Sequence, residues 1–435
     1  MIGRQGTFLD HLPSGWSFDR LKDVVALRND KTAEASAEED YLELEDLESG
    51  TGRIIRRRNT LQVESAVTVF QKGDVLFGKL RTYLEKYYQA DFDGKCTGEI
   101  LAFQPLRITS RFLFYCVGSP WFIQLCNALA YGAKMPRVSW TTQLSQFHVP
   151  LPPVAEQHVI SVYLDASCAA IDAAVTTKRK QIEMLDSLRL DAVSLAVTRG
   201  LSHSPKLRRT SNAWMARVPA HWDLVSLKRV ADIQGGLTLG KVYEGSLIER
   251  PYLRVANVQD GHLDLDEITT IEVPAAVAAR VELRVGDVLM TEGGDLDKLG
   301  RGTIWNGEIP DCLHQNHIFA VRCLKHKLLP QFLAHLTTSR FGRDYFEATG
   351  KRTTNLASTN STKVGLFPIP RPPLKEQQVI CAYLDTRFAE LASIKRCIES
   401  QIEALSSYRK SLIHECVTGQ RRIADEDLNR VTVHG

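Results

Sequence analysis

Residues 150–157 read PLPPVAEQ, and residues 370–377 read PRPPLKEQ. In each octapeptide the last proline, Pro153 or Pro373, comes just before helix-favouring residues, and its fixed φ suits the first turn of a helix. The glutamate at the seventh position places a negative charge near the positive helix end. Each octapeptide therefore predicts a helix start. Because the second follows the first by 220 positions, the sequence predicts a chain built twice.

A helical pattern follows each octapeptide. Apolar residues recur at steps of three and four over residues 160–195 and again over 380–412, which is the period of an amphipathic helix. Each segment covers about 40–45 residues, or about 60–70 Å at 1.5 Å per residue. Such a helix has a narrow apolar stripe that needs a partner, and the repeat supplies one. Two repeats related by a two-fold axis place their helices antiparallel. We therefore expect an antiparallel coiled coil with the two mixed domains held at its opposite ends.

The segment before each helix also repeats, with spacings that grow from 206 to 220 residues. The two domains are therefore expected to share a scaffold and to differ in loops, where binding specificity usually lies. The matching features are tryptophan openings at 12–24 and 218–230, turn-and-strand runs at 73–77 and 286–290, second strands at 98–103 and 316–321, and short apolar helices that begin at Phe112 and Phe332 and end near Ser119 and Ser339.

These signals predict an α+β fold with two pseudo-repeated α/β domains, separated by a long antiparallel two-helix coiled coil and related by a pseudo-two-fold axis. The expected boundaries are 1–150 for the first domain, 151–200 for the first helix, 201–370 for the second domain, 371–423 for the second helix and 424–435 for a frayed tail.

Composition narrows the class of protein. The net charge is only +3, so contacts to nucleic acid must come from local basic patches. Nine cysteines, an odd number without a CxxC pair, indicate a reducing cytosol rather than a disulfide framework. The N-terminus has no apolar signal core, and no stretch approaches the length of a membrane span. We therefore expect a cytoplasmic protein without membrane contact.

The motifs of common catalytic sites are missing from the sequence. There is no GxxxxGK[ST], no GxGxxG after a strand and no HExxH, so no cofactor, metal or catalytic residue is predicted. Two groups of residues could in principle bind a metal. His314 and His317 lie near Cys312, but no second ligand pair completes a tetrahedron. The acidic residues between Glu34 and Glu48 are more simply explained as a solvated loop or helix face.

Basic and polar loops occur in both halves. Lys and Arg neutralise phosphates, and Arg, Asn, Gln and Thr can hydrogen-bond base edges in the major groove. A single such residue is most simply a solubilising charge, but their occurrence at corresponding places in the two halves favours DNA contact. The candidate DNA-binding residues are Arg57, Arg58, Lys79, Arg81, Tyr83, Lys134 and Arg137 in the first half, and Lys298, Arg301, Lys351, Arg352 and Asn355 in the second.

Taken together, these features resemble the specificity subunit of a type I restriction-modification system, over nearly the whole chain. The resemblance is carried by the twin octapeptides, Tyr-Leu-Asp at 163–165 and 383–385, the Gly-Asp-Val-Leu runs, Lys-Leu-Arg at 79–81 and the tryptophan openings. One departure is that Gly293-Gly294-Asp295, followed by Lys298-Leu299-Gly300-Arg301, stands at the second Lys-Leu-Arg position. The two domains therefore need not grip DNA identically.

The resemblance implies two target recognition domains, each of which reads one half of a split double-stranded DNA target. It implies a helical spacer that docks two methyltransferase subunits. The chain itself would be non-catalytic. It would direct adenine methylation by these partners, and restriction subunits would add translocation and cutting.

The exposed helix faces are candidate partner surfaces, although ordinary solvated flanks explain each residue as well. They include Lys178, Arg179, Lys180, Arg189, Lys395, Arg396 and Arg409. Two other classes stay open on the residues alone. One is a fused DNA methyltransferase or nuclease with an unfamiliar site, which would turn over without partners. The other is a coiled-coil adaptor without DNA affinity, which would show no salt-dependent binding to a duplex.

Overall fold

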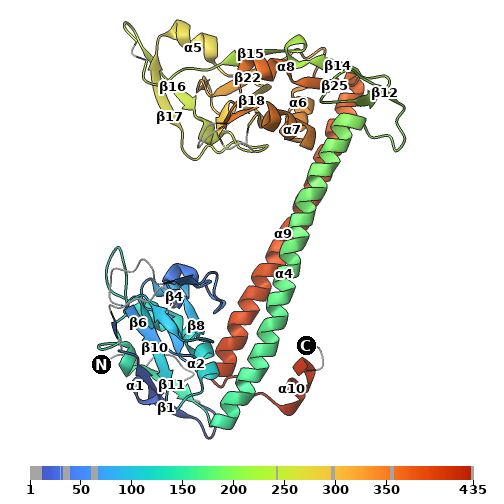
Figure 1. The fold of residues 1–435 in the computed structure, drawn as a ribbon. Coiled ribbons are helices and arrows are strands. Elements are labelled where there is room, and N and C mark those ends of the chain that lie inside the picture. The colour runs from blue at the N-terminus through green and yellow to red at the C-terminus, as the bar shows by residue number, and fades with distance from the viewer. Residues whose placement is uncertain are drawn as a thin grey trace. The chain divides into compact units, whose positions relative to one another are not determined.

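The structure, a computed structural model, describes residues 12–29, 31–32, 40–59, 67–241, 243–294, 299–352 and 357–432. The chain divides into two compact units, Met1–Arg179 with Glu399–Gly435, and Lys180–Ile398. Each unit combines one mixed α/β domain with a segment of each of two long helices, α4 (Val154–Arg199) and α9 (Leu374–Val417) (Figure 1).

The first domain is built around a four-stranded antiparallel sheet of order β2-β10-β7-β8. These strands are Val25–Leu27, Ile100–Pro105, Val75–Gly78 and Tyr87–Gln89. A second sheet has the order β3-β6-β9-β4-β5, with strands Lys31–Thr32, Val67–Phe70, Gly94–Cys96, Asp40–Leu42 and Arg58–Asn59. The domain's helical turns are α1 (Leu21–Val24), η2 (Leu44–Asp46), η3 (Thr82–Leu84), α2 (Ser110–Val117), α3 (Pro120–Leu129) and η4 (Leu144–Gln146).

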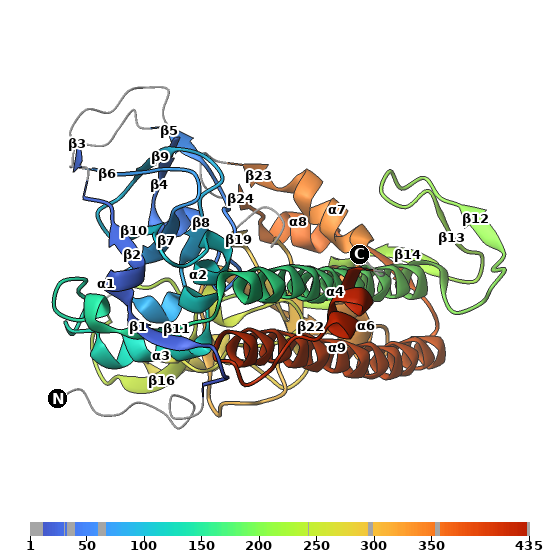
Figure 2. The ribbon, with the colours of Figure 1, turned by 90° about the horizontal axis from the view of Figure 1, so that it is seen from below.

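The second domain repeats the four-stranded sheet in the order β15-β22-β18-β20, with strands Ala231–Gly235, Ile318–Cys323, Asp287–Thr291 and Gly302–Ile304. Its other sheets are β17-β16-β21 (Thr269–Val273, Ile248–Leu253, Leu313–His314) and β19-β24-β23 (Gly293–Gly294, Ala357–Ser358, Lys351–Arg352). Its helical turns are η5 (Leu227–Arg229), η6 (Val255–Asn257), α5 (Ala275–Val281), α6 (Pro330–Thr338), α7 (Arg340–Thr349) and α8 (Ser361–Leu366). A hairpin of β12 (Leu207–Arg209) and β13 (Arg217–Pro219) stands apart from the four-stranded sheet of this unit (Figure 2).

Both octapeptides occupy the same structural position. In the first half β1 (Ser17–Arg20) pairs with β11 (His148–Leu151), and in the second β14 (Asp223–Ser226) pairs with β25 (Pro368–Arg371). The strand that opens each domain therefore lies beside the strand that leads into each long helix. This pairing explains why the tryptophan openings and the octapeptides repeat together.

The tryptophan and the glutamate of each repeat form a direct bond. Nε1–H of Trp16 donates to Oε2 of Glu156 at 2.9 Å. Nε1–H of Trp222 donates to Oε1 of Glu376 at 3.1 Å. Because each carboxylate also lies in the first turn of its helix, it stabilises the helix end and anchors the domain opening.

The glutamine of each octapeptide is fully buried and bridges two backbone groups. The side chain of Gln157 accepts from the Thr109 N–H at 2.7 Å and donates to the Pro152 carbonyl at 2.9 Å. Gln377 likewise accepts from the N–H of Leu329 and donates to the carbonyl of Pro372, both at 2.9 Å. An apolar residue at either position would leave these buried backbone groups unsatisfied.

Within each unit a segment of α4 lies beside a segment of α9 (Figure 1 and Figure 2). In the first unit the early part of α4, with Leu164 and Cys168, shares one core with Leu412 and Cys416 near the end of α9. In the second unit the late part of α4, around Val197, shares a core with the early part of α9. The predicted antiparallel pairing of the two helices is confirmed.

One expectation about hydropathy was wrong. Among the described residues, α4 is long and apolar enough over part of its length to cross a membrane. The helices α2 and α3 are so only when taken together, and they are bent by 58° relative to each other. The physical reason is packing, because Ile160, Leu164 and Ile171 of α4 lie in the core of the first unit.

The helices α3 and α7, which follow α2 and α6, were not predicted from the sequence. Ser119 and Ser339, expected as helix ends, also cap new helices. The hydroxyl of Ser119 accepts from the Phe122 N–H at 3.3 Å, and that of Ser339 accepts from the Gly342 N–H at 3.1 Å. A short helix, α10 (Asp425–Thr432), also forms where a frayed tail was expected.

Candidate nucleic-acid interface

Two predicted DNA-binding loops of the first domain lie side by side. Leu80 and Arg137 form a β-bridge, the Arg81 N–H donates to the Pro136 carbonyl at 2.7 Å, and the Val138 N–H donates to the Lys79 carbonyl at 3.0 Å. The second loop is closed by two backbone bonds between Tyr131 and Arg137, at 3.0 and 2.9 Å. The structure thus brings together Lys79, Arg81, Tyr83, Lys134 and Arg137, which are distant in sequence.

These five side chains differ in exposure. Arg81, Tyr83 and Lys134 are exposed, and 55% of the Tyr83 side chain is accessible. Among the described residues, the Lys134 ammonium forms no ion pair. The loop that carries Arg81 is anchored below by a 2.6 Å bond from the Thr82 hydroxyl to the Asn127 side chain. The exposed groups therefore stand on a fixed backbone, as recognition of a defined surface requires.

Lys79 and Arg137 line a neighbouring groove of about 760 Å³. Its wall also includes Arg28, Tyr131 and Trp140. Arg137 bonds Glu99 through two nitrogens, at 3.0 and 3.1 Å, and this bond raises the pKa of the guanidinium. Arg137 therefore serves first to position the hairpin, and Lys79 is the freer cation of the two.

Arg57 and Arg58 lie on a different part of the domain, at strand β5. Nε of Arg58 bonds the buried Asp46 at 2.8 Å, and Nη1 lies 2.9 Å from Glu43. Bonds to Asp46 and Glu45 raise the pKa of Arg58. Arg57 pairs with Asp91 at 3.3 Å and stacks 4.0 Å over the ring of Phe92.

The same contacts correct the interpretation of the acidic stretch 34–48 as a solvated face. The carboxylate of Asp46 is fully buried, accepts from the Glu43 N–H at 2.8 Å and faces both Arg56 and Arg58. Its arginine partners lie ten and twelve residues further along the chain, so the local sequence could not reveal them. Residues 33–39 lie outside the described residues.

The second domain places its basic hairpin at the matching position. Gly293 and Gly294 pair with Ser358 and Ala357, as Leu80 pairs with Arg137 in the first domain. Lys351 and Arg352 on β23 are exposed, and Arg352 lies 3.7 Å from Glu347. Arg301, just before β20, is partly buried. Lys298 and Asn355 lie outside the described residues.

The two hairpins therefore share a scaffold but not their charges. Glycines stand where the first domain has Leu80 and Arg81, so this segment of the second domain contributes backbone rather than a cation. The departure seen in the sequence at Gly293-Gly294 thus corresponds to a real difference in the exposed surface.

The histidines once weighed as metal ligands have separate partners. His314 is fully buried, its Nδ1 lies 3.0 Å from the Ile318 carbonyl, and burial lowers its pKa to about 4. Nδ1 of His317 lies 2.8 Å from Glu292. Burial raises the pKa of the Cys312 thiol to about 12. Over the described part of the chain, no group of three His, Cys, Asp or Glu side chains is placed to hold a metal.

The chain is similar to proteins of one family. Residues 13–184 match the type I restriction modification DNA specificity domain. The chain is 26% identical over 206 residues to the putative type I restriction enzyme MjaX specificity subunit of Methanocaldococcus jannaschii, which covers 47% of each protein. It is 22% identical over 321 residues to the EcoKI specificity subunit of Escherichia coli K12, covering 72% of this chain and 66% of the relative.

The match to these relatives spans about half to two thirds of their length. A longer match exists to the type I restriction enzyme StySPI specificity subunit of Salmonella potsdam, with 20% identity over 431 residues, 94% of this chain and 90% of the relative. The similarity thus extends over both halves of the chain.

Two solved structures share the fold. One comes from a study of complex assembly and conformational transition of the type I R-M system, with a TM-score of 0.69 and 20% identity over 93% of this chain and 98% of that chain. The other is the HsdS subunit of Thermoanaerobacter tengcongensis, with a TM-score of 0.50 and 21% identity over 94% and 98% of the two chains.

Proposed function

We propose that this chain, which is similar to type I restriction-modification specificity subunits, is the sequence-specific DNA-binding subunit of such a complex. The observation that carries the proposal is the duplication of a basic, backbone-bonded hairpin on the same sheet scaffold in two domains. Each domain, 1–150 and 201–370, would read one half of a bipartite target. The helices, 151–200 and 371–423, would form the spacer that sets the length of unread DNA.

The hairpins supply the chemistry that DNA recognition needs. Exposed cations such as Lys134 and Lys351 neutralise phosphates and release counterions. Arg81 and Tyr83, beside them, are placed to reach base edges or sugars. Because the backbone of the first hairpin is held by its own hydrogen bonds, ordering it on DNA costs little conformational entropy.

Catalysis would come from partner subunits. Methyltransferase subunits, two per chain to match the two-fold repeat, would modify adenine, and restriction subunits would translocate and cut DNA. The similar proteins are specificity subunits of type I restriction enzymes, which supports this division of labour. The chain itself would be non-catalytic, would hold no cofactor and would act in the cytoplasm, where these partners meet DNA.

The proposal is tested by methylome sequencing of cells with and without this chain. The expected result is a two-part target, methylated on adenine in both strands, that disappears on deletion of the gene. A methylome without any change would contradict the proposal. Incubating the purified chain alone with DNA, magnesium and S-adenosylmethionine separates the enzymatic alternative, because turnover without partners would favour a fused methyltransferase or nuclease.

A further inference from the structure

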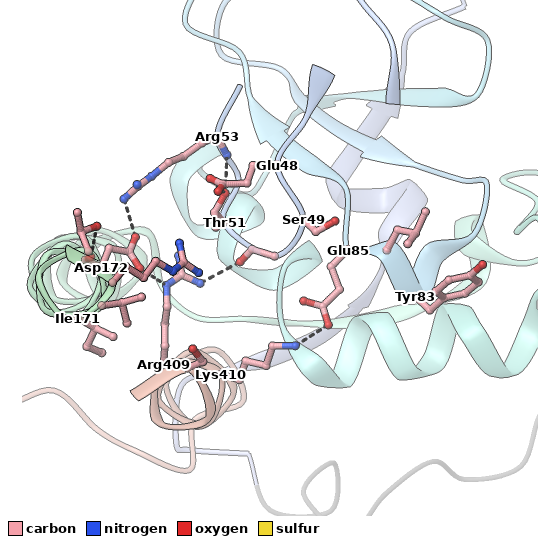
Figure 3. Close-up of a pocket in the computed structure, with 16 residues that line it drawn as sticks. Glu48, Ser49, Thr51, Arg53, Tyr83, Glu85, Ile171, Asp172, Arg409 and Lys410 are labelled. Carbon is pink, nitrogen blue, oxygen red and sulfur yellow. Dashed lines mark hydrogen bonds and ion pairs between the residues drawn. The ribbon is translucent and has the colours of Figure 1, made fainter. Parts of the chain in front are cut away.

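One carboxylate of α4 joins three chain segments of the first unit. Oδ2 of Asp172 lies 2.6 Å from Nη2 of Arg53, which belongs to the first domain. Oδ1 of the same residue lies 3.2 Å from Nε of Arg409 on α9 (Figure 3). Asp172 therefore connects the domain to both helices at one point.

The turn around Gly50 adds further contacts to this point. Nη1 of Arg409 donates to the Gly50 carbonyl at 3.1 Å, and the Tyr87 hydroxyl donates to the same carbonyl at 3.0 Å. Lys410, next on α9, pairs with Glu85 at 2.7 Å, and the carbonyl of Glu85 accepts from the Gly50 N–H at 2.9 Å. We call these residues, Gly50, Arg53, Glu85, Asp172, Arg409 and Lys410, the first seat.

Two residues of the first seat, Asp172 and Arg409, are nearly buried, whereas Arg53 is exposed. The side chains of Asp172 and Arg409 are only 19% and 11% exposed, whereas Arg53 is 57% exposed. Nε of Arg409 lacks hydrogen-bond alignment despite its 3.2 Å distance from Asp172, so this contact is mainly electrostatic. Removing Asp172 would leave a nearly buried guanidinium without its counter-charge, which proteins tolerate poorly. The sequence analysis placed Arg409 among the candidates for an exposed partner surface. Its burial shows that it is not part of such a surface.

The first seat adjoins a cavity of about 500 Å³ between the domain and the helices. The cavity is lined by cations, but Arg53, Arg409 and Lys410 are already neutralised by Asp172 and Glu85, which argues against a site for an anionic ligand. The turn around Gly50 meets α9 here through polar and charged contacts. The apolar contacts of α4 with the core of this unit include Leu164, Ile171 and Val175, so they extend to both sides of Asp172. The ion pairs of the first seat therefore add charged contacts to an apolar contact between the domain and the helices.

The second domain has no matching carboxylate. Arg189 is the repeat partner of Arg409, 220 positions earlier, and its guanidinium lies 4.6 Å over the ring of Phe388. Ala392 stands where the first half has Asp172. This cation–π contact joins the two helices, whereas Asp172 joins the first domain to both helices. The second domain meets α4 through a different ion pair, in which Nε of Arg340 lies 2.8 Å from Asp191.

We propose that Asp172 is a positioning residue, which fixes the first recognition domain on the spacer helices and so determines how strictly one length of unread DNA is required. The inference rests on the proposed function. One base pair more or less shifts a half-site by about 3.4 Å and rotates it by about 35°, taking 10–10.5 base pairs per turn. A domain held by the first seat must break charged contacts to follow that shift. Targets with the wrong spacing should therefore be methylated more slowly.

The test uses the full chain assembled with its methyltransferase subunits, and duplexes with the native spacer or a spacer one base pair longer or shorter. For Asp172→Ala we expect the ratio of methylation rates, native over mis-spaced, to fall about tenfold, within the usual range of coupling between sites. Asp172→Glu keeps the carboxylate and should retain most of the discrimination. Asp186→Ala is the matched control, because Asp186 pairs with Lys395 between the helices at 3.1 Å and belongs to neither domain.

Several outcomes would overturn the inference. One is an unchanged ratio in a folded Asp172→Ala complex, and another is an equal loss of rate on all spacers, which marks a purely structural role. If Asp172→Ala fails to fold, Arg53→Ala removes only the exposed arm, and an unchanged ratio there also counts against the proposal. Failure of the proposed function itself is distinct, because the wild-type complex would then methylate none of the duplexes.

Discussion

A cation contributes to DNA affinity only if no carboxylate of the protein has already neutralised it. By this criterion Lys134 and Arg58, both predicted to bind DNA, differ. Lys134 is exposed, whereas Arg58 contacts Asp46, Glu43 and Glu45. We expect Lys134→Gln to reduce the slope of log K against log salt by about 0.9, one phosphate contact. Arg58→Gln should leave the slope unchanged and lower the free energy of unfolding by roughly 1–3 kcal/mol, because Asp46 loses a partner.

The measurement is duplex binding over a salt series, with urea unfolding of the same preparations. A smaller slope for Arg58→Gln, or an unchanged slope for Lys134→Gln, would show that the exposed and the paired cations have been assigned wrongly.

At the same scale, His314 makes unfolding depend on pH. Its pKa is about 4 in the folded chain, against 6.5 for an exposed histidine, because burial disfavours the charged ring. Between these values the unfolded state binds the extra proton, so stability falls as pH drops from 6.5 towards 4, by at most about 3 kcal/mol. In His314→Gln this part of the pH dependence should disappear. Urea unfolding at pH 7 and pH 5 checks it, and an identical pH dependence in variant and wild type would refute the assignment.

The residue scale also shows how far sequence reasoning reaches. The repeated glutamate and glutamine were recognisable because both halves keep them, and the structure gives each the same bonds. Which cations are neutralised was not recognisable. Asp46 and Glu99 lie outside the loops that carry Arg58 and Arg137, and only the fold brings them within 3 Å.

At the scale of elements, periodicity predicted the long helices well and the short ones poorly. The helices α4 and α9 have apolar stripes over ten turns or more, so their period is clear. The helix α3 follows α2 after Gly118 and Ser119, and α7 follows α6 after Ser339 alone; in both places the serine caps the next helix. A serine after an apolar helix is ambiguous in sequence, because it suits either role. The small sheet β19-β24-β23 was missed for a similar reason, since two-residue strands carry no period.

The helix pair leads to a prediction about spacing. Lys395 and Asp186 face each other at 3.1 Å, so the heptad 182–188 of α4 faces the heptad 392–398 of α9. Removing both heptads shortens the spacer by about 10 Å at 1.5 Å per residue, and the unread DNA should shorten by about three base pairs. Methylome sequencing of the double deletion measures the spacing. The control replaces Lys180 and Glu183 by alanine at unchanged length, and an unaltered spacer in the double deletion would refute the idea that the helices set it.

At the scale of the whole chain, each unit is assembled from segments far apart in sequence. The core of the first unit joins residues near Trp16 to the end of α9, and that of the second joins the end of α4 to Trp222. Neither domain can complete its core without a helix that belongs to the other half of the repeat. The duplication in the sequence predicted two domains and an antiparallel helix pair, but not which residues complete each core, because these contacts span more than 200 residues.

Separate cores predict separable unfolding. Phe112 and Phe332 are repeat partners, both fully buried, one in the core of each unit. Replacing either by alanine removes a ring from one core and should cost about 3–5 kcal/mol there. Calorimetry should then show the transition of the first unit lowered in Phe112→Ala and that of the second lowered in Phe332→Ala. Because α4 and α9 contribute to both units, some coupling is expected, and the double variant measures it as a deviation from additivity. A single transition that moves equally in both variants would mean that the helices join the two cores into one cooperative structure.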